Sequence, residues 1–517
     1  MCGILGSLPN TDKDFFSKNL NLLSHRGPDA EGIIHIRDEI SFGHKRLSII
    51  DLSENASQPM TKFSRFHLIF NGEIYNFIEI KENLLKKGYK FVSNSDSEVL
   101  IYSYIEWGEN CVNFFNGMWA FAIWDSLQKK LFLSRDRLGE KPLYYSLINN
   151  GIVFASEQKA ILPFLDEISA SKQFKELVKD PYSYSKSNKT LFSKILKFPP
   201  GHNGTFYNQK LKIERFWIPN FSKANYNLSY SEQVEYLNYL IEDSCKLRLR
   251  SDVPIATALS GGIDSSTIAS FVKNIYQKNQ NNYQFNRHQT GFNMSFPGSV
   301  MDENHYSKKI SESLGIRLKT VTSEKSKMAL ELEKVCYLFE DIQEVNPLPH
   351  YFLYQNIKSN GFSVSLDGHG GDELFCGYES SILNAIPENI FDLNKINYIY
   401  KIYCDIHPKN KYFKKMNLIQ ICNYLLKNNI KLNLKNNLDK DMQGFFSNLN
   451  SLSKHLFVLT FETVLPTLLR NYDRYSMMSG VEIRMPLLDY RIVEFAFSLP
   501  WQSKLKDGYS KSILREQ

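Results

Sequence analysis

Near the start of the chain, the residue that could do covalent chemistry is Cys2. The chain begins MCGILGS, so removal of Met1 would leave Cys2 with its own α-amine beside its sulfur. The reference pKa of an α-amine is about 7.7–8.0, so this amine can act as a general base at neutral pH without a histidine. A single cysteine near a terminus is more often a passenger, so its role depends on what else the chain carries.

A substrate amide that carries its own α-amino and α-carboxylate groups needs a cation, an anion and donors for an oxyanion. Arg46 can bind a carboxylate through two parallel hydrogen bonds, and Asp96 can pair with an ammonium. Asn71 and Gly72 can supply N–H groups to an oxyanion hole. Taken singly, Arg46 and Asp96 are more typical of surface ion pairs, and Asn71 with Gly72 of a turn.

The strongest local motif is ALSGGIDSS, residues 258–266, which follows an apolar strand and opens a helix. Its glycines let backbone N–H groups approach an anion, and the helix N-terminus adds partial positive charge. The loop lacks the Gly-Lys-Ser/Thr of a Walker A motif and resembles the SGGxDS loop of enzymes that cleave ATP between the α and β phosphates. Asp264 would repel phosphate unless a cation lay between them, so it predicts Mg²⁺. The other residues expected around the pyrophosphate are Ser260, Gly261, Gly262, Ser265 and Ser266. The alternative interpretation is a Gly/Ser-rich turn between a strand and a helix.

A second glycine segment, SLDGHGGDELFCGY at residues 365–378, also follows an apolar strand. Asp372 could be the other Mg²⁺ ligand, and Gly368 could let the backbone approach a nucleotide. Asp/Gly turns are usually structural, so this segment supports a nucleotide site only because it follows the first loop in the chain.

The first part of the chain, to about residue 217, predicts a layered α+β domain. Residues 118–136 have two apolar stretches around a polar turn and predict a hairpin. Residues 66–70 form a short apolar run that the NGE of residues 71–73 is expected to end as a turn. Helices are expected over residues 77–88 and 95–108.

From about residue 232 the pattern changes to alternating strands and helices. Such βα units predict a parallel sheet with helices on both faces. The expected strands are 253–259, 289–296, 317–322 and 362–366, and the expected helices are 265–277 and 302–315, the second with Asp302 in its first turn. The Asn/Lys-rich segment 380–455 reads as a helical lobe, and the Pro/Gly/Asn-rich segment 199–229 as the domain boundary.

The composition is that of an ordinary globular protein, with 43% hydrophobic and 23% charged residues among 517. The net charge of +7 comes largely from lysines scattered among asparagines, which favours solvated helices over nucleic-acid binding. The seven cysteines form no CxxC or Cys/His cluster, so neither disulfides nor zinc are indicated. Without a secretory signal or 18 consecutive apolar residues, the expected location is the cytoplasm and no membrane partner is expected.

Taken together, the motifs resemble the glutamine-dependent asparagine synthetase family. The segments that carry the resemblance span nearly the whole chain in family order: MCGILG, HRGPD (25–29), RLSIIDLS (46–53), NGEIYN (71–76), SDSEVL (95–100), RDRLGEKPLYY (135–145), LSGGIDSS, GGDELFCGY and DRYSMMSGVEIRMPLLDYRIVEFA (473–496). The resemblance implies a four-layer αββα N-terminal-nucleophile glutaminase domain over residues 2–217. It also implies an adenine-nucleotide α-hydrolase-like synthetase domain with a Rossmann-like parallel sheet over residues 232–517.

The chemistry implied by the resemblance is activation of an acceptor carboxylate by ATP as an acyl-adenylate. Ammonia released from glutamine would reach this intermediate through an internal tunnel. Cys2 would be the nucleophile, and Lys511 would stabilise the pentacoordinate transition state. The residues matched to glutamine binding are Arg46, Asn71, Gly72, Glu73 and Asp96, and those matched to ATP contacts are Ala258, Met294 and Gly368, with Ser260 to Ser266 as the pyrophosphate loop. The resemblance also leaves room for a homodimer.

Three departures from the family pattern concern the acceptor. His369 stands where many members have an acidic residue thought to help organise acceptor chemistry, and the residues expected to bind aspartate before MPLLD cannot be matched. Family members usually continue beyond the ILRE element, whereas this chain stops at Gln517, so the synthetase domain reads as C-terminally truncated. The leading acceptor is aspartate; the alternatives are another carboxylate, such as a uronic-acid sugar in surface-polysaccharide synthesis, and a non-catalytic or glutaminase-only remnant.

Overall fold

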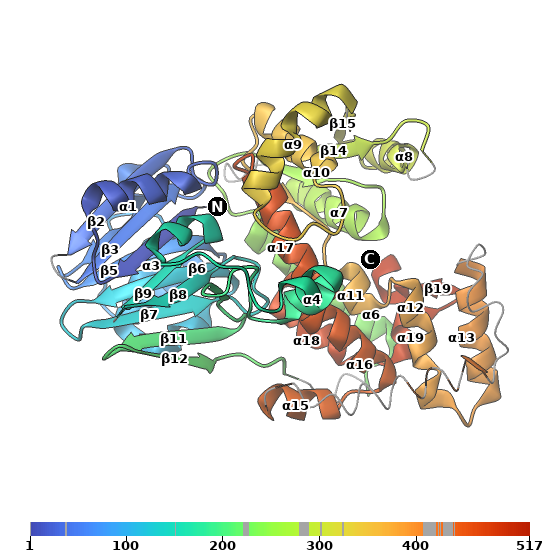
Figure 1. Ribbon diagram of the computed structural model, residues 1–517. Coiled ribbons are helices and arrows are strands. Elements are labelled where there is room, and N and C mark those ends of the chain that lie inside the picture. The colour runs from blue at the N-terminus through green and yellow to red at the C-terminus, as the bar shows by residue number, and fades with distance from the viewer. Residues whose placement is uncertain are drawn as a thin grey trace.

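The computed structural model describes residues 2–36, 39–149, 151–220, 227–278, 289–299, 302–322, 325–406 and 440–517, with residues 420, 421, 423, 425, 427 and 438. The N-terminal part, blue to green in Figure 1, lies beside a C-terminal part that runs from yellow-green to red. The α/β and α+β architecture predicted for the two parts is confirmed.

Among the described residues, the N-terminal part has two antiparallel sheets packed face to face. Across the first sheet the strands are β10 (Leu196–Lys197), β8 (Tyr144–Ile148), β9 (Gly151–Ala155), β1 (Gly3–Leu8), β3 (Ile40–Arg46) and β2 (Ala30–Ile36). Across the second they are β12 (Lys210–Arg215), β11 (His202–Tyr207), β7 (Lys130–Arg135), β6 (Gly117–Asp125), β5 (Phe66–Ile74) and β4 (Met60–Lys62). Ile4, Phe42 and Ile69 meet in the apolar layer between the sheets, where they are fully buried.

Helices cover the outer faces of both sheets, which completes the four layers. α1 (Lys13–Leu20) packs Phe16 and Leu20 on the first sheet, and α2 (Phe77–Lys86) and α3 (Asp96–Trp107) cover the second. The hydroxyl of Ser95 caps α3 by accepting from Ser97 N at 3.0 Å, as the sequence predicts. Two short helices, α4 (Phe174–Lys179) and α5 (Pro181–Lys186), lie between β9 and β10 in the chain.

The hairpin predicted over residues 118–136 is confirmed, but the turn predicted at residues 71–73 is wrong. β6 and β7 pair antiparallel and meet at Asp125 and Lys130. β5 runs through Asn71 and Gly72 to Ile74, paired with β6 along its whole length. Pairing with β6 overrides the local turn preference of Asn-Gly, and it places both residues within the strand.

The C-terminal part is built on a parallel sheet, as predicted. The strand order is β15 (Arg317–Thr322), β14 (Thr290–Ser295), β13 (Ile255–Ala258), β16 (Val364–Leu366) and β17 (Glu482–Arg484), and every adjacent pair is parallel. The helices around it are α6 (Tyr230–Arg248), α7 (Ile263–Lys278), α8 (Asn304–Leu314), α9 (Lys325–Phe339) and α10 (Leu348–Ser359). α8 begins two residues after Asp302, whose Oδ1 accepts from Asn304 N at 3.2 Å, so Asp302 precedes the helix.

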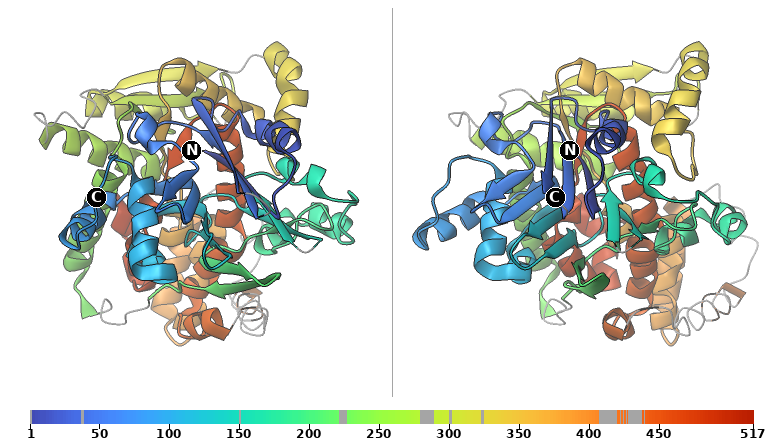
Figure 2. Two further views of the ribbon diagram at one scale, coloured as in Figure 1. Left: turned by 90° about the vertical axis from the view of Figure 1, so that its left-hand side faces the viewer. Right: turned by 60° about the vertical axis from the view of Figure 1, so that its left-hand side comes forward.

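The rest of the chain is mainly helical. It comprises α11 (Gly371–Phe375), α12 (Glu379–Ile382), α13 (Leu393–Ile406), α15 (Lys440–Ser447), α16 (Ser451–Phe457), a π-helical turn (Val458–Glu462), α17 (Val464–Met477), α18 (Tyr490–Phe497), α19 (Trp501–Lys504) and α20 (Ser512–Arg515), with a small hairpin of β18 (Leu505–Lys506) and β19 (Tyr509–Ser510). The helical lobe predicted over 380–455 is confirmed where the structure describes it, and most of its middle lies outside the described residues. Figure 2 shows α17, in red, running through the interior of the protein.

One described stretch, Ser451–Met477, is long and apolar enough to span a membrane by length and composition alone. Half of its most apolar window is buried inside the protein, as is also found in core helices. By itself this stretch is weak support for a membrane span.

Asp489 is a buried carboxylate that joins the two parts of the chain. It accepts from Arg248 at 3.1 Å, from Arg491 at 2.9 Å and, across the boundary, from Asn116 Nδ2 at 2.8 Å. Although burial favours the protonated acid, hydrogen bonds and charge from Arg491 and Arg248 hold the pKa of Asp489 well below its usual range. Asp489 therefore stabilises the fold only in its ionised form.

Asp489→Asn should lower the free energy of unfolding by roughly 3 kcal/mol, because it leaves the buried Arg248 without a charged partner. A carboxyl with a depressed pKa stabilises the fold above its unfolded value of about 3.9 and loses that contribution as the pH falls. The difference in urea midpoint between wild type and variant should therefore be constant at neutral pH and shrink below about pH 4. Asp507→Asn, at an exposed site, is the control. A midpoint difference that does not change with pH would contradict this assignment.

Candidate functional site

Cys2 lies just before β1 and is held between β5 and the segment after β3. Its backbone N donates to Asn71 Oδ1 at 2.9 Å, and its Sγ lies 4.0 Å from Leu47 O. Only 9% of the residue is exposed. Burial raises the pKa of the Cys2 thiol. A base must therefore take the thiol proton before the sulfur can attack.

Asn71 and Gly72 lie beside Cys2, and the surrounding protein restricts which residues could stand at either position. Asn71 is fully buried, and its Nδ2 has no hydrogen-bond partner among the described residues. Gly72 has φ +154°, and a Cβ at this position would lie 2.1 Å from Met118 O. An unpaired buried N–H donor is costly to retain, so Asn71 Nδ2 is poised to bind an acceptor atom.

Arg46 and Asp96 are also ordered by backbone contacts. The guanidinium of Arg46 donates to Ser53 O at 2.9 Å and to Asp51 O, so it is tied to the loop that follows β3. Asp96 Oδ2 accepts from Ile74 N at 2.9 Å at the end of β5. Burial raises the pKa of Asp96 to about 6. At neutral pH this carboxylate can therefore pair with an ammonium.

Glu73 lies in a buried cluster of acidic side chains, one of which, Glu482, belongs to the C-terminal part. Its Oε1 lies 3.3 Å from Nη2 of Arg484 on β17, and Arg484 also donates to Glu482 Oε1 at 2.7 Å. Burial, together with Glu482 and Asp96, raises the pKa of Glu73 well above its usual value. The family resemblance matches Glu73 to glutamine binding alone and gives no role to Glu482 and Arg484, which lie beside it.

Arg26 is a site residue whose role sequence reasoning missed, although it stands in the quoted HRGPD motif. It is fully buried, and its Nε donates to Cys2 O at 3.2 Å. Its Nη atoms form two hydrogen bonds with Asp473 of α17, at 2.9 and 3.2 Å, and one with Glu157 at 2.9 Å. The backbone of Cys2 is thus held by a side chain that the synthetase part orients.

The second candidate site is a cavity of about 510 Å³ at the carboxyl ends of β13 and β14. It brings together most of the predicted ATP and metal residues, namely Ala258, Ser260, Gly262, Asp264, Ser265, Met294, Gly368, Asp372 and Lys511. The carboxyl edge of a parallel sheet is where ligands bind in open α/β folds. Gly261 and Ser266 are the predicted loop residues that are not among its lining residues.

The predicted pyrophosphate loop, residues 260–266, is held by its own side chains. Ser260 Oγ accepts from Gly262 N at 3.2 Å and hydrogen-bonds to Ser265 Oγ at 3.0 Å. Ser266 Oγ instead donates to Gly262 O at 2.8 Å, back into the helix. Gly261 has φ +86°, and a Cβ there would lie 2.6 Å from Ser307 N, so this glycine lets the loop pack against α8.

Lys511 reaches back from the end of the chain to the carboxylates of both motifs. Its Nζ lies 2.8 Å from both carboxylate oxygens of Asp264 and 2.7 Å from Asp372 Oδ1. Burial raises the pKa of Asp264 to about 6 although Lys511 lowers it. Burial opposes the charge of Lys511, but the two carboxylates raise its pKa above the usual value. Lys511, Asp264 and Asp372 form one charged unit at the mouth of the predicted pyrophosphate loop.

This unit also fits a Mg²⁺ ion bound with a nucleotide. Mg²⁺ is usually held by one or two carboxylates together with substrate phosphates and water. Asp264 and Asp372 already share one cation, the Lys511 ammonium, so both face a position where positive charge is stable. Within the described residues no group of three or more His, Cys, Asp or Glu side chains could hold a metal ion alone. The ligand set is therefore suited to a metal that arrives with phosphate.

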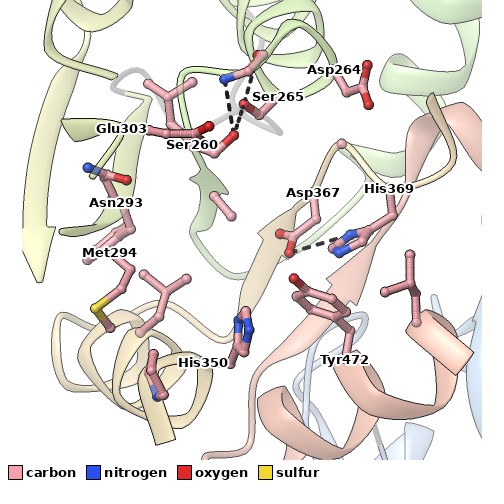
Figure 3. A pocket seen from close by; sticks show the side chains of 18 of the residues that line it. Ser260, Asp264, Ser265, Asn293, Met294, Glu303, His350, Asp367, His369 and Tyr472 are labelled. Carbon is pink, nitrogen blue, oxygen red and sulfur yellow. Dashed lines mark hydrogen bonds and ion pairs between the residues drawn. The ribbon is translucent and has the colours of Figure 1, made fainter. Parts of the chain in front are cut away.

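Across the cavity from the loop lies a wall formed by Asp367, His369, Tyr472 and His350 (Figure 3). Asp367 accepts from the hydroxyls of Tyr354 at 2.7 Å and Ser365 at 2.5 Å. The rings of His369 and Tyr472 meet edge to face, with centroids 4.0 Å apart. Sequence reasoning singled out His369 and gave no role to Asp367, although both stand in the second glycine segment. It missed His350 and Tyr472, because they lie outside the quoted motifs.

Comparisons with known proteins agree with this two-site arrangement. Residues 1–217 match the family model described as a glutamine amidotransferase domain, and residues 237–517 match the model described as asparagine synthase. The chain is 31% identical to asparagine synthetase (glutamine-hydrolyzing) 3 of Bacillus subtilis and 29% identical to the enzyme numbered 1 of the same organism; each match covers 100% of this chain and 84% of the relative. It is 26% identical to the amidase chry2 of Gibberella zeae, over 96% of this chain and 81% of that protein.

Asp473→Asn should lower the rate of glutamine hydrolysis by roughly tenfold, because Arg26 would lose its two-bond partner and Cys2 would be held less firmly. The measurement is glutamate release from glutamine alone, with Asp166→Asn, at an exposed position, as the control. Thermal unfolding of both variants separates a loss of positioning from a loss of fold. A wild-type glutaminase rate in folded Asp473→Asn would show that Arg26 does not position Cys2.

Proposed function

The chain belongs to the glutamine-hydrolysing asparagine synthetase family and is a glutamine-dependent carbon–nitrogen ligase, and from this premise we propose that it converts a carboxylate into a primary amide through an acyl-adenylate, using ATP and Mg²⁺. The observation that carries the proposal is the contact of Lys511 with Asp264 and Asp372. It joins the end of the chain to both predicted phosphate motifs.

In the glutaminase half, Cys2 Sγ attacks the carboxamide carbon of glutamine, and its proton passes to the α-amine that is free once Met1 is removed. The oxyanion is stabilised by Asn71 Nδ2 and by the backbone N–H of Gly72. Ammonia leaves with the transferred proton, and water then hydrolyses the thioester to glutamate. Arg46 and Asp96 supply opposite charges for the α-carboxylate and the α-ammonium of glutamine. The thiol must be reduced, which fits a cytoplasmic enzyme.

In the synthetase half, an oxygen of the acceptor carboxylate attacks the α-phosphorus of ATP. The bond from that phosphorus to the bridging oxygen breaks, and pyrophosphate leaves into the loop of residues 260–266. Lys511 stabilises the charge that develops on the α-phosphate. Asp264 and Asp372 would hold Mg²⁺, which neutralises phosphate charge when bound. Ammonia then attacks the acyl carbon, which releases AMP and a proton and leaves the amide.

The names of the Bacillus relatives make L-aspartate the first acceptor to test, with L-asparagine, L-glutamate, AMP and pyrophosphate as products. The second candidate is the same chemistry on another carboxylate. It is favoured by His369 in the cavity wall and by the relative named as an amidase. A glutaminase-only remnant would not need a lysine held between Asp264 and Asp372, so the contacts of Lys511 favour an active synthetase site.

Cys2→Ala should abolish glutamine hydrolysis and glutamine-dependent amide synthesis, because no other group forms the thioester. Synthesis with ammonium chloride should remain within about twofold of wild type, because the two half-reactions use separate sites. Glutamate and amide formation are measured in parallel, with Cys111→Ala, a buried cysteine elsewhere in the domain, as the control. Glutaminase activity in Cys2→Ala would rule out Cys2 as the nucleophile.

Asp264→Asn and Asp372→Asn should each lower acceptor-dependent pyrophosphate release by at least about 100-fold, because each removes a charge that balances the metal. Glutamine hydrolysis should be nearly unchanged, since these carboxylates lie at the other site. Pyrophosphate is measured over a range of Mg²⁺ concentrations, with Asp507→Asn as the exposed control. Wild-type pyrophosphate release in both variants would contradict the assigned ligands.

A further inference from the structure

A second, smaller cavity lies between the two parts of the chain. Its volume is about 60 Å³, and it shares no lining residue with the synthetase cavity. The N-terminal part contributes the end of β7 and the segment after it, together with α5 and the end of β10, and the C-terminal part contributes α17. α17 therefore borders two cavities: Tyr472 lines the synthetase cavity, whereas Arg470 and Arg474 line this interdomain cavity.

Basic side chains are the main charged groups of the interdomain cavity. Among the described residues that line it, they are Arg135, Lys197, Arg470 and Arg474. Arg470 is paired with Glu344. Arg474 is paired with Glu340 at 2.8 Å and with Glu157 at 3.3 Å. The protein itself therefore balances the charge of the two arginines on α17.

The two cations from the N-terminal part lack such a balance. The guanidinium of Arg135 donates to three backbone carbonyls, those of Lys141 at 2.7 Å, Phe198 at 2.6 Å and Gly139 at 3.0 Å. Lys197 Nζ donates to Tyr184 O at 2.6 Å and lies over the Tyr184 ring, 3.9 Å from its centroid. Neither side chain forms an ion pair with a carboxylate of the described residues, and each keeps N–H groups that these contacts do not use.

The two acids that line the cavity do not supply the missing negative charge. Both carboxylate oxygens of Asp473 accept from Arg26, at 2.9 and 3.2 Å. Burial raises the pKa of Glu140 to about 8, so this side chain is mostly the neutral acid at pH 7. A neutral carboxylic acid offers an O–H donor and no charge. The lining therefore carries a net positive charge.

The state of Lys197 reflects this excess of positive charge. Burial, together with the charges of Arg470 and Arg135, lowers the pKa of Lys197 to about 7 against the opposing charge of Asp341. A buried cation without a partner is costly, and a nearby negative charge favours its protonated form. A small anion in the cavity would therefore be bound by Lys197 and Arg135 together.

The size and donors of the cavity indicate which kind of anion fits. One water needs about 15 Å³ of such space, so a cavity of about 60 Å³ has room for roughly four atoms of oxygen size. Arginine and lysine bind phosphate-like oxyanions through charge-assisted hydrogen bonds. The hydroxyl of Tyr144, also in the lining, accepts from Arg474 Nη2 at 3.0 Å, which leaves its proton available to an anion.

We propose that the interdomain cavity binds one tetrahedral oxyanion of the inorganic phosphate class, held by Arg135 and Lys197 on one side and bordered by α17 on the other. The ion supplies the negative charge that the lining lacks. Because it contacts both parts of the chain, it stabilises their docking. This site is separate from the pyrophosphate loop, and the ion takes part in neither half-reaction.

The first test compares phosphate binding by wild type, Lys197→Met and Lys194→Met in equilibrium dialysis of the whole protein. Methionine removes the charge and keeps an unbranched side chain, and Lys194 is an exposed lysine nearby in the sequence. Lys197→Met should weaken phosphate binding at one site per chain at least about tenfold, as expected for the loss of one charge-assisted hydrogen bond, and Lys194→Met should not. Phosphate in the loop of residues 260–266 is common to all three proteins. Equal binding by wild type and Lys197→Met would overturn the proposal.

Competition identifies the class of ion. Sulfate should displace phosphate from the interdomain cavity, whereas chloride at the same ionic strength should not, because a single atom cannot fill the space. Displacement by neither ion would identify phosphate itself as the ligand. Chloride that competes as well as sulfate would overturn the assignment of a tetrahedral oxyanion.

A measurement on the unaltered protein keeps the proposal testable if Lys197→Met does not fold, as judged by its glutamine hydrolysis. Wild-type crystals soaked in selenate, a tetrahedral oxyanion, should show an anomalous selenium peak between Arg135 and Lys197. A peak at the loop of residues 260–266 alone, or no peak, would overturn the proposal.

Discussion

Buried arginines whose partners lie across the domain boundary hold the two catalytic halves together. Arg26 pairs with Asp473, Arg474 approaches Glu157 at 3.3 Å, and Arg484 approaches Glu73 at 3.3 Å. Each guanidinium is at most 1% exposed. Removing one partner of such a pair leaves a buried charge and costs about 3–5 kcal/mol, so the domains are strongly restricted to one docking arrangement.

The same contacts tie the geometry of one site to that of the other. Tyr472 and Asp473 are neighbours on α17; Tyr472 packs on His369 in the synthetase cavity, whereas Asp473 holds the arginine that contacts Cys2. A helix is a rigid connection over this length. The cavity wall at His369 and the backbone of Cys2 are thus positioned from adjacent residues, although they belong to different candidate sites.

The loop side of the synthetase cavity was largely predictable from sequence, and so were most of the elements that build it. A strand, a glycine loop and a helix in succession place Ser260, Asp264 and Ser265 by local geometry alone, and the parallel sheet then brings Gly368 alongside, close enough that a Cβ would lie 2.6 Å from Ser265 N. The turn expected at Asn71 was wrong because pairing with β6 outweighs a local preference. Glu73 illustrates the other limit: its partner Arg484 lies about 400 residues away, and no spacing rule connects them.

The wall formed by His350, Asp367 and Tyr472 could not be predicted from the sequence for a related reason. The loop of residues 260–266 is one continuous motif, so its spacing alone indicates which side chains lie together. His350, Asp367 and Tyr472 meet only after three separate segments have folded together, so no spacing rule connects them. Changes in this wall leave the charged unit of Asp264, Asp372 and Lys511 intact. Under the function proposed above, a change in the wall would alter which carboxylate is adenylated and leave the phosphate chemistry in place.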